Sequence, residues 1–304
     1  MGTAFGGIMK NRIIAAVVAL SVPVILSLSS ERAFAGETCH GKLAKGFYDE
    51  YQRLPAALRD RAMYAELCSL EYPEAQNAIK HAQQFGRDRE LGLTYGLVSL
   101  DDFSPDPGAK SEPVSASGPS PADTLSEDRF SQWKSGYCVQ NATADPSRAA
   151  EFLMQRAGAR NAETGRSTGD WLACMRKQPG LTCWATPAGA SAAEQGEEFL
   201  FNVNWTSTGS HPEALPEVEY SYLTRGGIGK FKGAGPSRIL PGGYKLKAGT
   251  QQIAVTRPSD KGVIATLKVN HAGTEHSCKV FVPGDKDFPL SEPFVNRLKL
   301  KYPG

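Results

Sequence analysis

The sequence predicts a mixed α+β protein of two domains, in which a disulfide-linked helical domain precedes an antiparallel, immunoglobulin-like β-sandwich. Three observations lead to this fold class. The chain has 304 residues, enough for about two domains. Apolar residues recur at helical spacing in the first part, whereas from Phe199 onward they alternate with a period of two. Six cysteines, an even number, could form three disulfides.

The composition is that of a globular protein. Hydrophobic residues make up 40% of the chain and charged residues 22%, which excludes a wholly disordered, a collagenous or a multi-pass membrane protein. The chain has 34 Lys and Arg against 32 Asp and Glu, so its formal net charge is +2. This small excess of positive charge depends on the first segment of the chain.

Residues 1–35 have the pattern of a secretory signal peptide. Lys10 and Arg12 precede an apolar run at 13–28, and Ala33-Phe34-Ala35 is a small-x-small cleavage site. The apolar run has 16 residues, whereas a membrane-spanning helix needs about 20. A retained membrane anchor is the alternative interpretation.

Cleavage after residue 35 removes three basic side chains and one acidic side chain, so that the mature chain carries 31 of each. A mature net charge of zero gives no reason to expect a specific nucleic acid as a partner. We therefore expect a periplasmic or secreted protein that has no transmembrane span in its mature form.

Residues 36–103 are predicted as the first part of the helical domain. Pro55 opens a second helix and Pro73 a third, because proline is favourable in the first turn. Residues 91–100 are rich in Leu, Val and Tyr, and we expect a strand there. The apolar stripe of the first helix consists of Leu43, Phe47 and Tyr51.

A Pro- and Ser-rich linker or insertion is predicted at residues 104–126, which contain too few large apolar residues to form a core. Residues 127–190 are predicted as the second part of the helical domain. They begin after the N-cap Ser126 and contain a further helix starting at Asp145-Pro146. The small residues between 185 and 196 mark the expected domain boundary.

Residues 191–284 are predicted as the β-sandwich, because short alternating runs are separated by Gly and Pro turns. The chain shows no sustained β-α alternation, which argues against a Rossmann-like sheet. Residues 285–304 are rich in proline and are expected to form an extended C-terminal tail. One alternating run places three side chains on the same face of a strand: Val218, Tyr220 and Tyr222.

The six cysteines all follow the expected cleavage site, and export would place them in an oxidising compartment where disulfides persist. The absence of a C-x-x-C pair argues against a redox dithiol or a zinc knuckle, and no catalytic cysteine is expected. Order along the chain favours the pairs Cys39–Cys68, Cys138–Cys174 and Cys183–Cys278.

The segment from Arg225 to Gly249, here called the basic segment, has the most unusual composition. It contains eight glycines and no acidic residue. Residues 191–304 carry a net charge of +3 and residues 36–190 a net charge of −3. Glycine-rich backbone with nearby Lys and Arg can hold phosphate, sulfate or an anionic sugar, although a solvated loop between strands is the alternative. Its candidate ligand-binding residues are Arg225, Lys230, Lys232, Arg238, Lys245 and Lys247.

A second candidate is Ser167, which is the central residue of a G-x-S-x-G match at 165–169. In serine hydrolases this motif places the serine on a tight turn between a strand and a helix. The preceding residues 157–163 are too small and polar for a buried strand, which favours a helix cap at Ser167 or Thr168. An exported hydrolase using Ser167, an acid such as Asp170 and a later histidine is the enzymatic alternative.

His271 and His276 bracket an expected hairpin turn, and with Glu275 they could hold a metal such as zinc. The sequence has no H-x-H or H-E-x-x-H motif that would fix the ligand geometry. Polar histidines at an exposed hairpin end are the preferred interpretation, and no cofactor is expected.

These observations favour an exported, non-enzymatic binding or envelope-associated protein. Its ligand would be anionic, a glycan or a lipid headgroup, and would bind through the basic segment; a protein of the envelope is another possible partner. The alternatives are the hydrolase using Ser167 and a structural partner in an envelope complex.

Overall fold

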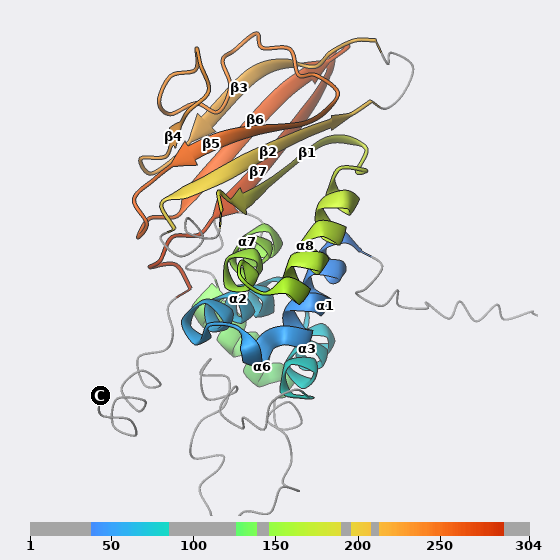
Figure 1. Ribbon diagram of the computed structural model, residues 1–304, viewed down its shortest axis with the longest axis vertical. Helices are drawn as coiled ribbons and strands as arrows, with labels where there is room; N and C mark the ends of the chain where they lie inside the picture. Colours follow the sequence, from blue (N-terminus) through green and yellow to red (C-terminus); the bar gives the residue numbers. More distant parts are fainter. Residues whose placement is uncertain (1–37, 85–125, 139–145, 190–195, 208–212, 289–304) are drawn as a thin grey trace, which may run out of the picture. The chain divides into compact units, whose positions relative to one another are not determined.

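A computed structural model describes five stretches of the chain (Figure 1). The expected signal peptide at 1–35, the expected strand at 91–100, all but the last residue of the linker at 104–126, and the tail beyond residue 288 lie outside them. Among the residues that the structure describes, no helix combines the length and the apolarity that a membrane span requires. The described residues are 38–84, 126–138, 146–189, 196–207 and 213–288.

The first half of the described chain is helical, as predicted. Thr38 caps the first helix by accepting a hydrogen bond from the backbone N–H of Gly41 at 3.0 Å. Asn161 caps the last helix in the same way, accepting from Thr164 at 2.9 Å. The helices are α1 (Cys39–Glu50), α2 (Ala56–Ser69), α3 (Tyr72–Gln84), α6 (Glu127–Trp133), α7 (Pro146–Gly158) and α8 (Ala162–Met175).

Helix α7 is the most deeply buried of the described helices. Every residue from Ala149 to Gly158 is buried, including Gln155 and Arg156. Its Leu153 belongs to the core shared by the helices, whereas its Phe152 belongs to the core of the sheets. The helix therefore connects the two hydrophobic cores, with α2 packed on it as well as strands of both sheets.

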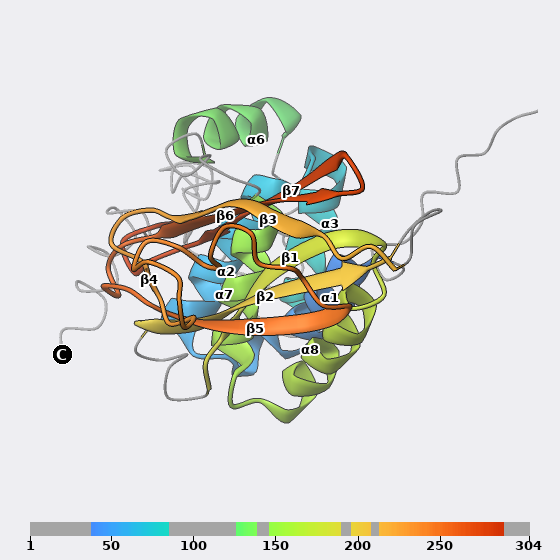
Figure 2. The same cartoon turned by 90° about the horizontal axis from the view of Figure 1, so that it is seen from above.

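The second half forms two antiparallel sheets, which Figure 2 shows as two layers. One sheet has the strand order β1-β2-β5-β4 and the other the order β3-β6-β7. Their inner side chains, such as Phe201 and Leu267, share one hydrophobic core. The mixed α+β class is confirmed, while the immunoglobulin-like topology and the two-domain layout stay predictions. The strands are β1 (Gly180–Pro187), β2 (Glu198–Thr206), β3 (Glu217–Leu223), β4 (Ile228–Gly229), β5 (Gly249–Thr256), β6 (Val263–His271) and β7 (Thr274–Val282).

Strand β1 corrects the expected extent of the helical segment. Residues 127–190 were predicted as the second part of the helical domain, but a strand begins within them, at Gly180. Trp184 of β1 packs into the core of the helices, whereas the neighbouring Cys183 and Ala185 pack into the core of the sheets. Because both faces are covered, β1 shows no alternation of apolar and polar residues.

All six cysteines are paired, as predicted, but only one predicted pair is confirmed. Cys183–Cys278 joins β1 to β7. The other two pairs are wrong: the structure has Cys39–Cys174, between α1 and α8, and Cys68–Cys138, after the end of α6. Neighbours in sequence are not neighbours in space here, because α1 packs along α8 and α2 contacts the helical turn at 134–138 that contains Cys138.

Buried arginines attach the end of the sheet region to the helices. Asp285 accepts hydrogen bonds from Arg156 of α7 at 3.0 Å and from Arg61 of α2 at 3.3 Å. Arg61 also donates to the carbonyl oxygens of Asp287, at 2.9 Å, and of Gly284. Residues just after β7 are thus fixed by side chains more than 100 positions away in the sequence.

Arg257 is another buried arginine that fixes backbone through its side chain, in this case within the sheet region. Only 5% of its surface is exposed. Its guanidinium donates to four backbone carbonyl oxygens: those of Val282 at 2.6 Å, Pro283 at 2.7 Å, Lys261 at 2.9 Å and Gly196 at 3.2 Å. The planar, five-donor geometry of arginine suits such a site. Burial and the nearby charge of Arg156 lower the pKa of Arg257, but the group stays charged at neutral pH.

Candidate functional site

The basic segment lies along one edge of each sheet. Its β4 pairs with β5 at the edge of the four-stranded sheet. Further along, it follows the outer side of β3: the N–H of Leu223 donates to the carbonyl of Ser237, and the N–H of Val218 donates to that of Tyr244, both at 2.8 Å. Uncovered strand edges invite pairing with other chains, so the segment also protects the two sheets.

The basic segment is held in place by its own side chains. Ile239, Leu240 and Leu246 are completely buried in the core shared by the sheets. The hydroxyl of Ser221, on β3, accepts from the N–H groups of Ile239 and Leu240 at 3.2 Å and donates to the Leu240 carbonyl at 2.6 Å. The segment is therefore a fixed part of the sheet region rather than a loose loop.

The backbone conformation of the basic segment can be tested at Gly229, where an added Cβ would collide with the carbonyl oxygen of Arg238. Gly235 lies in the same segment and has nothing within 4 Å of an added Cβ. We expect Gly229→Ala to be about 1–3 kcal/mol less stable than Gly235→Ala in urea unfolding. The two changes have the same effect on the flexibility of the unfolded chain, so equal stabilities would contradict the close approach.

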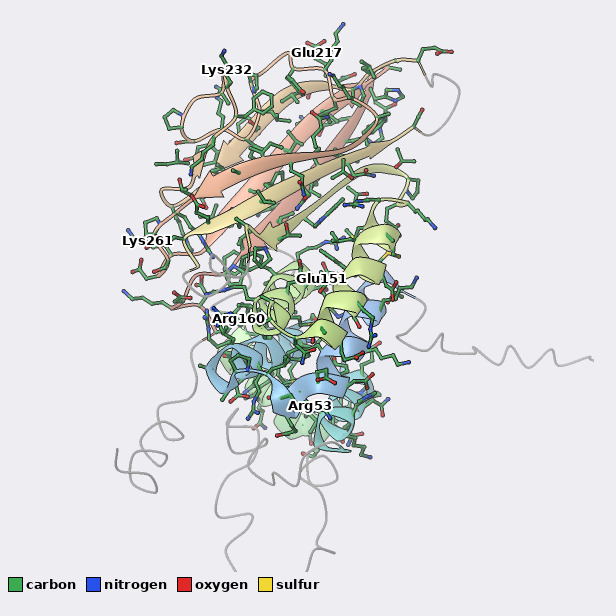
Figure 3. All side chains as sticks on the ribbon, in the orientation of Figure 1. Arg53, Glu151, Arg160, Glu217, Lys232 and Lys261 are labelled. Carbon is green, nitrogen blue, oxygen red and sulfur yellow. A yellow bond between two sulfur atoms is a disulfide. The ribbon has the colours of Figure 1, made fainter. Side chains whose placement is uncertain are left out.

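All six basic side chains of the segment are exposed. Lys230 forms an ion pair with Glu198 of β2 at 2.7 Å, and Lys245 forms a β-bridge with Glu217. In Figure 3, Lys232 extends outward at the end of the sheets that also carries Glu217. The β-bridge of Lys245 is a backbone pairing, so Lys230 alone of the six makes an ion pair with an acidic residue that the structure describes. The other five are Arg225, Lys232, Arg238, Lys245 and Lys247.

An open hollow of about 670 Å³ beside the segment is not suited to an anion. Its lining includes Glu213, Glu217 and Glu219, against the single cation Lys245. Three carboxylates around one ammonium group give a negative surface at neutral pH. Of the predicted ligand-binding residues, Lys245 is thus placed in an acidic environment and Lys230 is paired.

A pair of tyrosines lies on β3 beside the basic segment. Tyr220 is 49% exposed and Tyr222 is 42% exposed, and their rings stack with centroids 6.3 Å apart. The sequence placed Val218 on the same face, but β3 has an irregularity in register between Val218 and Tyr220. Such a bulge changes which residues face inward. Val218 is therefore buried and the tyrosines are exposed, which alternation alone could not predict.

Ser167 does not lie where a hydrolase nucleophile would. It is in the middle of α8, and the element directly before this helix is α7, not a strand. Its hydroxyl donates to the carbonyl of Glu163 at 3.4 Å and packs against Gly46 of α1. The N–H groups in the body of a helix are used within the helix and are not free to stabilise an oxyanion. The expected capping role of Ser167 is also wrong, because Asn161 is the cap.

The structure places His271 beside His276, but Glu275, the third predicted metal ligand, does not join them. Their rings lie 6.3 Å apart, and both contact the indole of Trp205, at 4.8 Å and 5.2 Å between centroids. Glu275 forms an ion pair with Lys268 instead. The described part of the chain has no group of three His, Cys, Asp or Glu that could hold a metal. The two histidines therefore form an aromatic cluster around Trp205.

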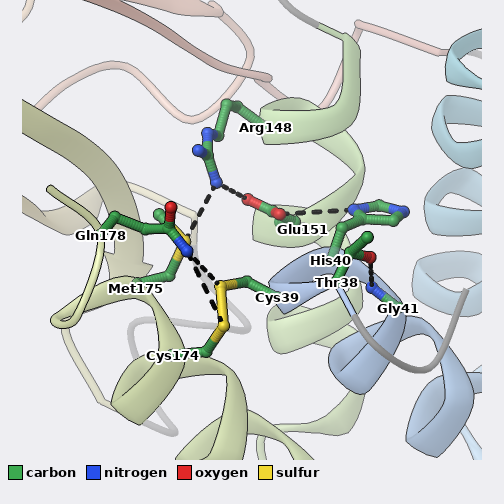
Figure 4. Close-up of a disulfide and its surroundings, with 9 residues drawn as sticks. All are labelled: Thr38, Cys39, His40, Gly41, Arg148, Glu151, Cys174, Met175 and Gln178. Carbon is green, nitrogen blue, oxygen red and sulfur yellow. Dashed lines mark hydrogen bonds and ion pairs between the residues drawn. A yellow bond between two sulfur atoms is a disulfide. The ribbon is translucent and has the colours of Figure 1, made fainter. Parts of the chain in front are cut away.

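A buried charged cluster lies among the helices, and the sequence analysis missed it. His40 of α1 donates from Nε2 to Glu66 of α2 at 3.0 Å and from Nδ1 to Glu151 of α7 at 3.3 Å. The Tyr48 hydroxyl donates to Glu66 at 2.6 Å, and Arg148 donates to Glu151 at 2.7 Å. Figure 4 shows the Arg148, Glu151 and His40 part of this cluster.

The cluster keeps His40 protonated at neutral pH. Burial by itself would lower the pKa of His40, but the charges of Glu66 and Glu151 and their hydrogen bonds raise it to about 10. Burial would likewise raise the pKa of Glu151, whereas His40 and Arg148 lower it. A histidine that is fully protonated cannot accept a proton as a general base. The cluster is therefore a charge-compensated support of the helices.

Little in the sequence indicates this cluster, because its members are distant from one another. His40 is 26 residues from Glu66 and 111 residues from Glu151. The three side chains meet only because α1, α2 and α7 pack together.

No family model, no curated protein and no solved structure matches this chain.

Proposed function

We propose that this is an exported binding protein without enzymatic activity, which holds an anionic glycan on the exposed surface of the basic segment. Residues 1–35 would direct its export to the periplasm or out of the cell. Three disulfides suit an oxidising compartment. We further propose that the two sheets form an immunoglobulin-like sandwich that presents this surface, in a domain separate from the helices.

The observation that carries the proposal is the contrast between the buried and exposed residues of one segment. Ile239, Leu240 and Leu246 fix its backbone, while every basic side chain remains exposed. A fixed backbone lowers the entropy lost when charged side chains bind a ligand. Among the described residues, Arg225, Lys232 and Arg238 have no acidic partner, and their donors are available for sulfate or carboxylate groups.

The stacked tyrosines favour a glycan over the other anionic ligands. Tyr220 and Tyr222 lie on the strand along which residues 237–244 run. Aromatic rings that are half exposed offer large, rigid contact area at a low entropic cost. The C–H groups of a sugar ring can pack on such a face while its anionic groups reach the cations, whereas a lipid headgroup would mainly use the cations.

The test is binding of heparin, as the anionic glycan, by the full mature chain. We expect binding that weakens steeply as salt is raised, and a loss of at least about tenfold in affinity for the triple variant R225A/K232A/R238A. The matched control K42A/K45A/K177A removes two exposed cations from α1 and one from the turn after α8, and it should bind as the wild type does. Neutral dextran serves as the uncharged comparison.

The outcomes distinguish the ligand classes. Weaker heparin binding by Y220A/Y222A supports contact with the sugar rings. Binding to vesicles with anionic lipid but not to heparin would replace the glycan by a lipid headgroup. Equal heparin affinities for the triple variant and its control would refute the basic segment as the binding surface.

A further inference from the structure

The Cys39–Cys174 disulfide is the one of the three in which neither cysteine is buried. Both of its cysteines are only half-buried. Cys68 and Cys138 are 6% and 9% exposed, and in the third disulfide Cys183 is 4% exposed while Cys278 is half-buried. A small thiol in solution can therefore reach Cys39–Cys174 from the folded state more readily than it can reach the others.

The two sulfur atoms of this disulfide have different electrostatic surroundings. Cys39 is the first residue of α1, where the helix dipole favours negative charge. Cys174 is in the last turn of α8, where the dipole disfavours negative charge. On reduction, Cys39 is thus the sulfur that better carries the charge of a thiolate.

A side-chain amide adds to this difference. The Nε2 of Gln178 lies 3.1 Å from the sulfur of Cys39 and 4.0 Å from that of Cys174, as Figure 4 shows. An N–H donor at the first distance stabilises a thiolate on Cys39 more than one on Cys174. Gln178 itself is exposed, so its removal should not disturb the fold.

We propose that Cys39–Cys174 is a site of reversible thiol–disulfide exchange with an external dithiol. One thiolate of the dithiol attacks the sulfur of Cys174, the bond between Cys174 and Cys39 breaks, and its electron pair leaves on Cys39. The second thiol of the reagent, as its thiolate, then attacks the mixed disulfide and releases Cys174, which takes up a proton. The dithiol is oxidised to a disulfide, and the protein disulfide is reduced to two thiols.

The helices have other contacts that keep the reduced protein folded. The close approach of Gly46 to Ser167 holds α1 against α8 away from the disulfide. His40 attaches the same end of α1 to Glu66 and Glu151. Because these contacts do not involve sulfur, opening the disulfide should free its two cysteines without unfolding the helices. The site can then close again on oxidation.

The experiment uses the mature protein in native buffer with graded dithiothreitol, followed by alkylation and mass spectrometry of each cysteine. We expect Cys39 and Cys174 to become alkylated at least about tenfold faster than the other four cysteines, with the fold retained by circular dichroism. With glutathione as a monothiol probe, the mixed disulfide should form at Cys174. Opening of all three disulfides together, or glutathione on Cys39, would overturn the proposal.

Gln178→Ala tests the polarity of the site without touching a cysteine. We expect reduction to slow by about threefold, since one donor to the leaving sulfur is lost, and the reduced Cys39 to react with iodoacetamide only at a higher pH. Lys177→Ala, a neighbouring exposed residue, is the matched control and should behave as the wild type. Identical rates for the two variants would rule out the stabilised Cys39 thiolate.

Discussion

Replacing Arg257 with methionine is expected to lower the free energy of unfolding by about 4 kcal/mol or more. The Cζ atom of Arg257 lies 5.9 Å from the ring centroid of Phe152 and 5.5 Å from that of Phe199. The methionine can fill the space next to these two rings. It cannot donate a hydrogen bond, so the four carbonyl oxygens lose this donor, and the three whose hydrogen bonds are buried cost about 1–3 kcal/mol each. Equilibrium unfolding in urea measures the loss.

Two further variants show whether geometry or charge is responsible. Arg257→Lys keeps the positive charge but cannot reach four carbonyls in a plane, and we expect it to recover only part of the stability. Arg176→Met replaces an exposed arginine and should change stability by less than about 0.5 kcal/mol. If Arg257→Lys were as stable as the wild type, the planar set of hydrogen bonds would not be the cause.

Replacing His40 with glutamine is expected to cost about 3–5 kcal/mol at pH 6.5, because it leaves the carboxylates of Glu66 and Glu151 buried with too little positive charge. Arg148 compensates Glu151 in part, whereas Glu66 keeps the hydroxyl of Tyr48 as a donor. Urea unfolding at several pH values measures the difference between the variant and the wild type.

The pH dependence of this difference has a definite sign. The pKa of His40 is raised from 6.5 to about 10 on folding, so the native state binds the proton more tightly than the unfolded state does. The stabilisation is complete below pH 6.5 and is lost as the pH rises through 10. The gap between wild type and His40→Gln should therefore narrow from pH 6.5 to pH 10.

A second histidine provides the control. His81 pairs with Asp49 at 2.6 Å, but both side chains are more than a third exposed. An exposed pair contributes about 0–1 kcal/mol, so His81→Gln should be a mild change. NMR titration of the His40 ring gives a direct check, and a His40 that loses its proton near pH 6.5 in the folded protein would contradict the buried cluster.

The strands were the most predictable part of the fold. The alternating runs from Phe199, Ile253 and Val263 lie in β2, β5 and β6, each with one face in the common core. Alternation is readable when one face of a strand is apolar and the other polar, as in β2, where Asn202 and Asn204 are buried on the face opposite the common core. In β1 and α7 both faces are buried. Their sequences therefore show no contrast between two faces from which the type of element or the direction of its side chains could be predicted.

The candidate sites depended on details that local patterns do not carry. Residues 165–169 fit the G-x-S-x-G motif around Ser167, but they lie inside a helix rather than on a turn between a strand and a helix. The pairing of Cys39 with Cys174 follows from how α1 and α8 pack, over a separation of 135 residues. The exposure of Tyr220 follows from one irregularity in β3. By contrast, the exposure of the basic side chains was predictable from composition, because unpaired Lys and Arg stay in water.

The Cys68–Cys138 disulfide has a consequence for how the chain responds to proteases. It closes a covalent loop that contains all of residues 85–125, and Cys39–Cys174 encloses the same stretch a second time. A single cut of the backbone there adds one water molecule but releases no fragment. Both bridges must open before the pieces can separate, so the protein stays one covalent molecule through a cleavage that would divide an unbridged chain in two.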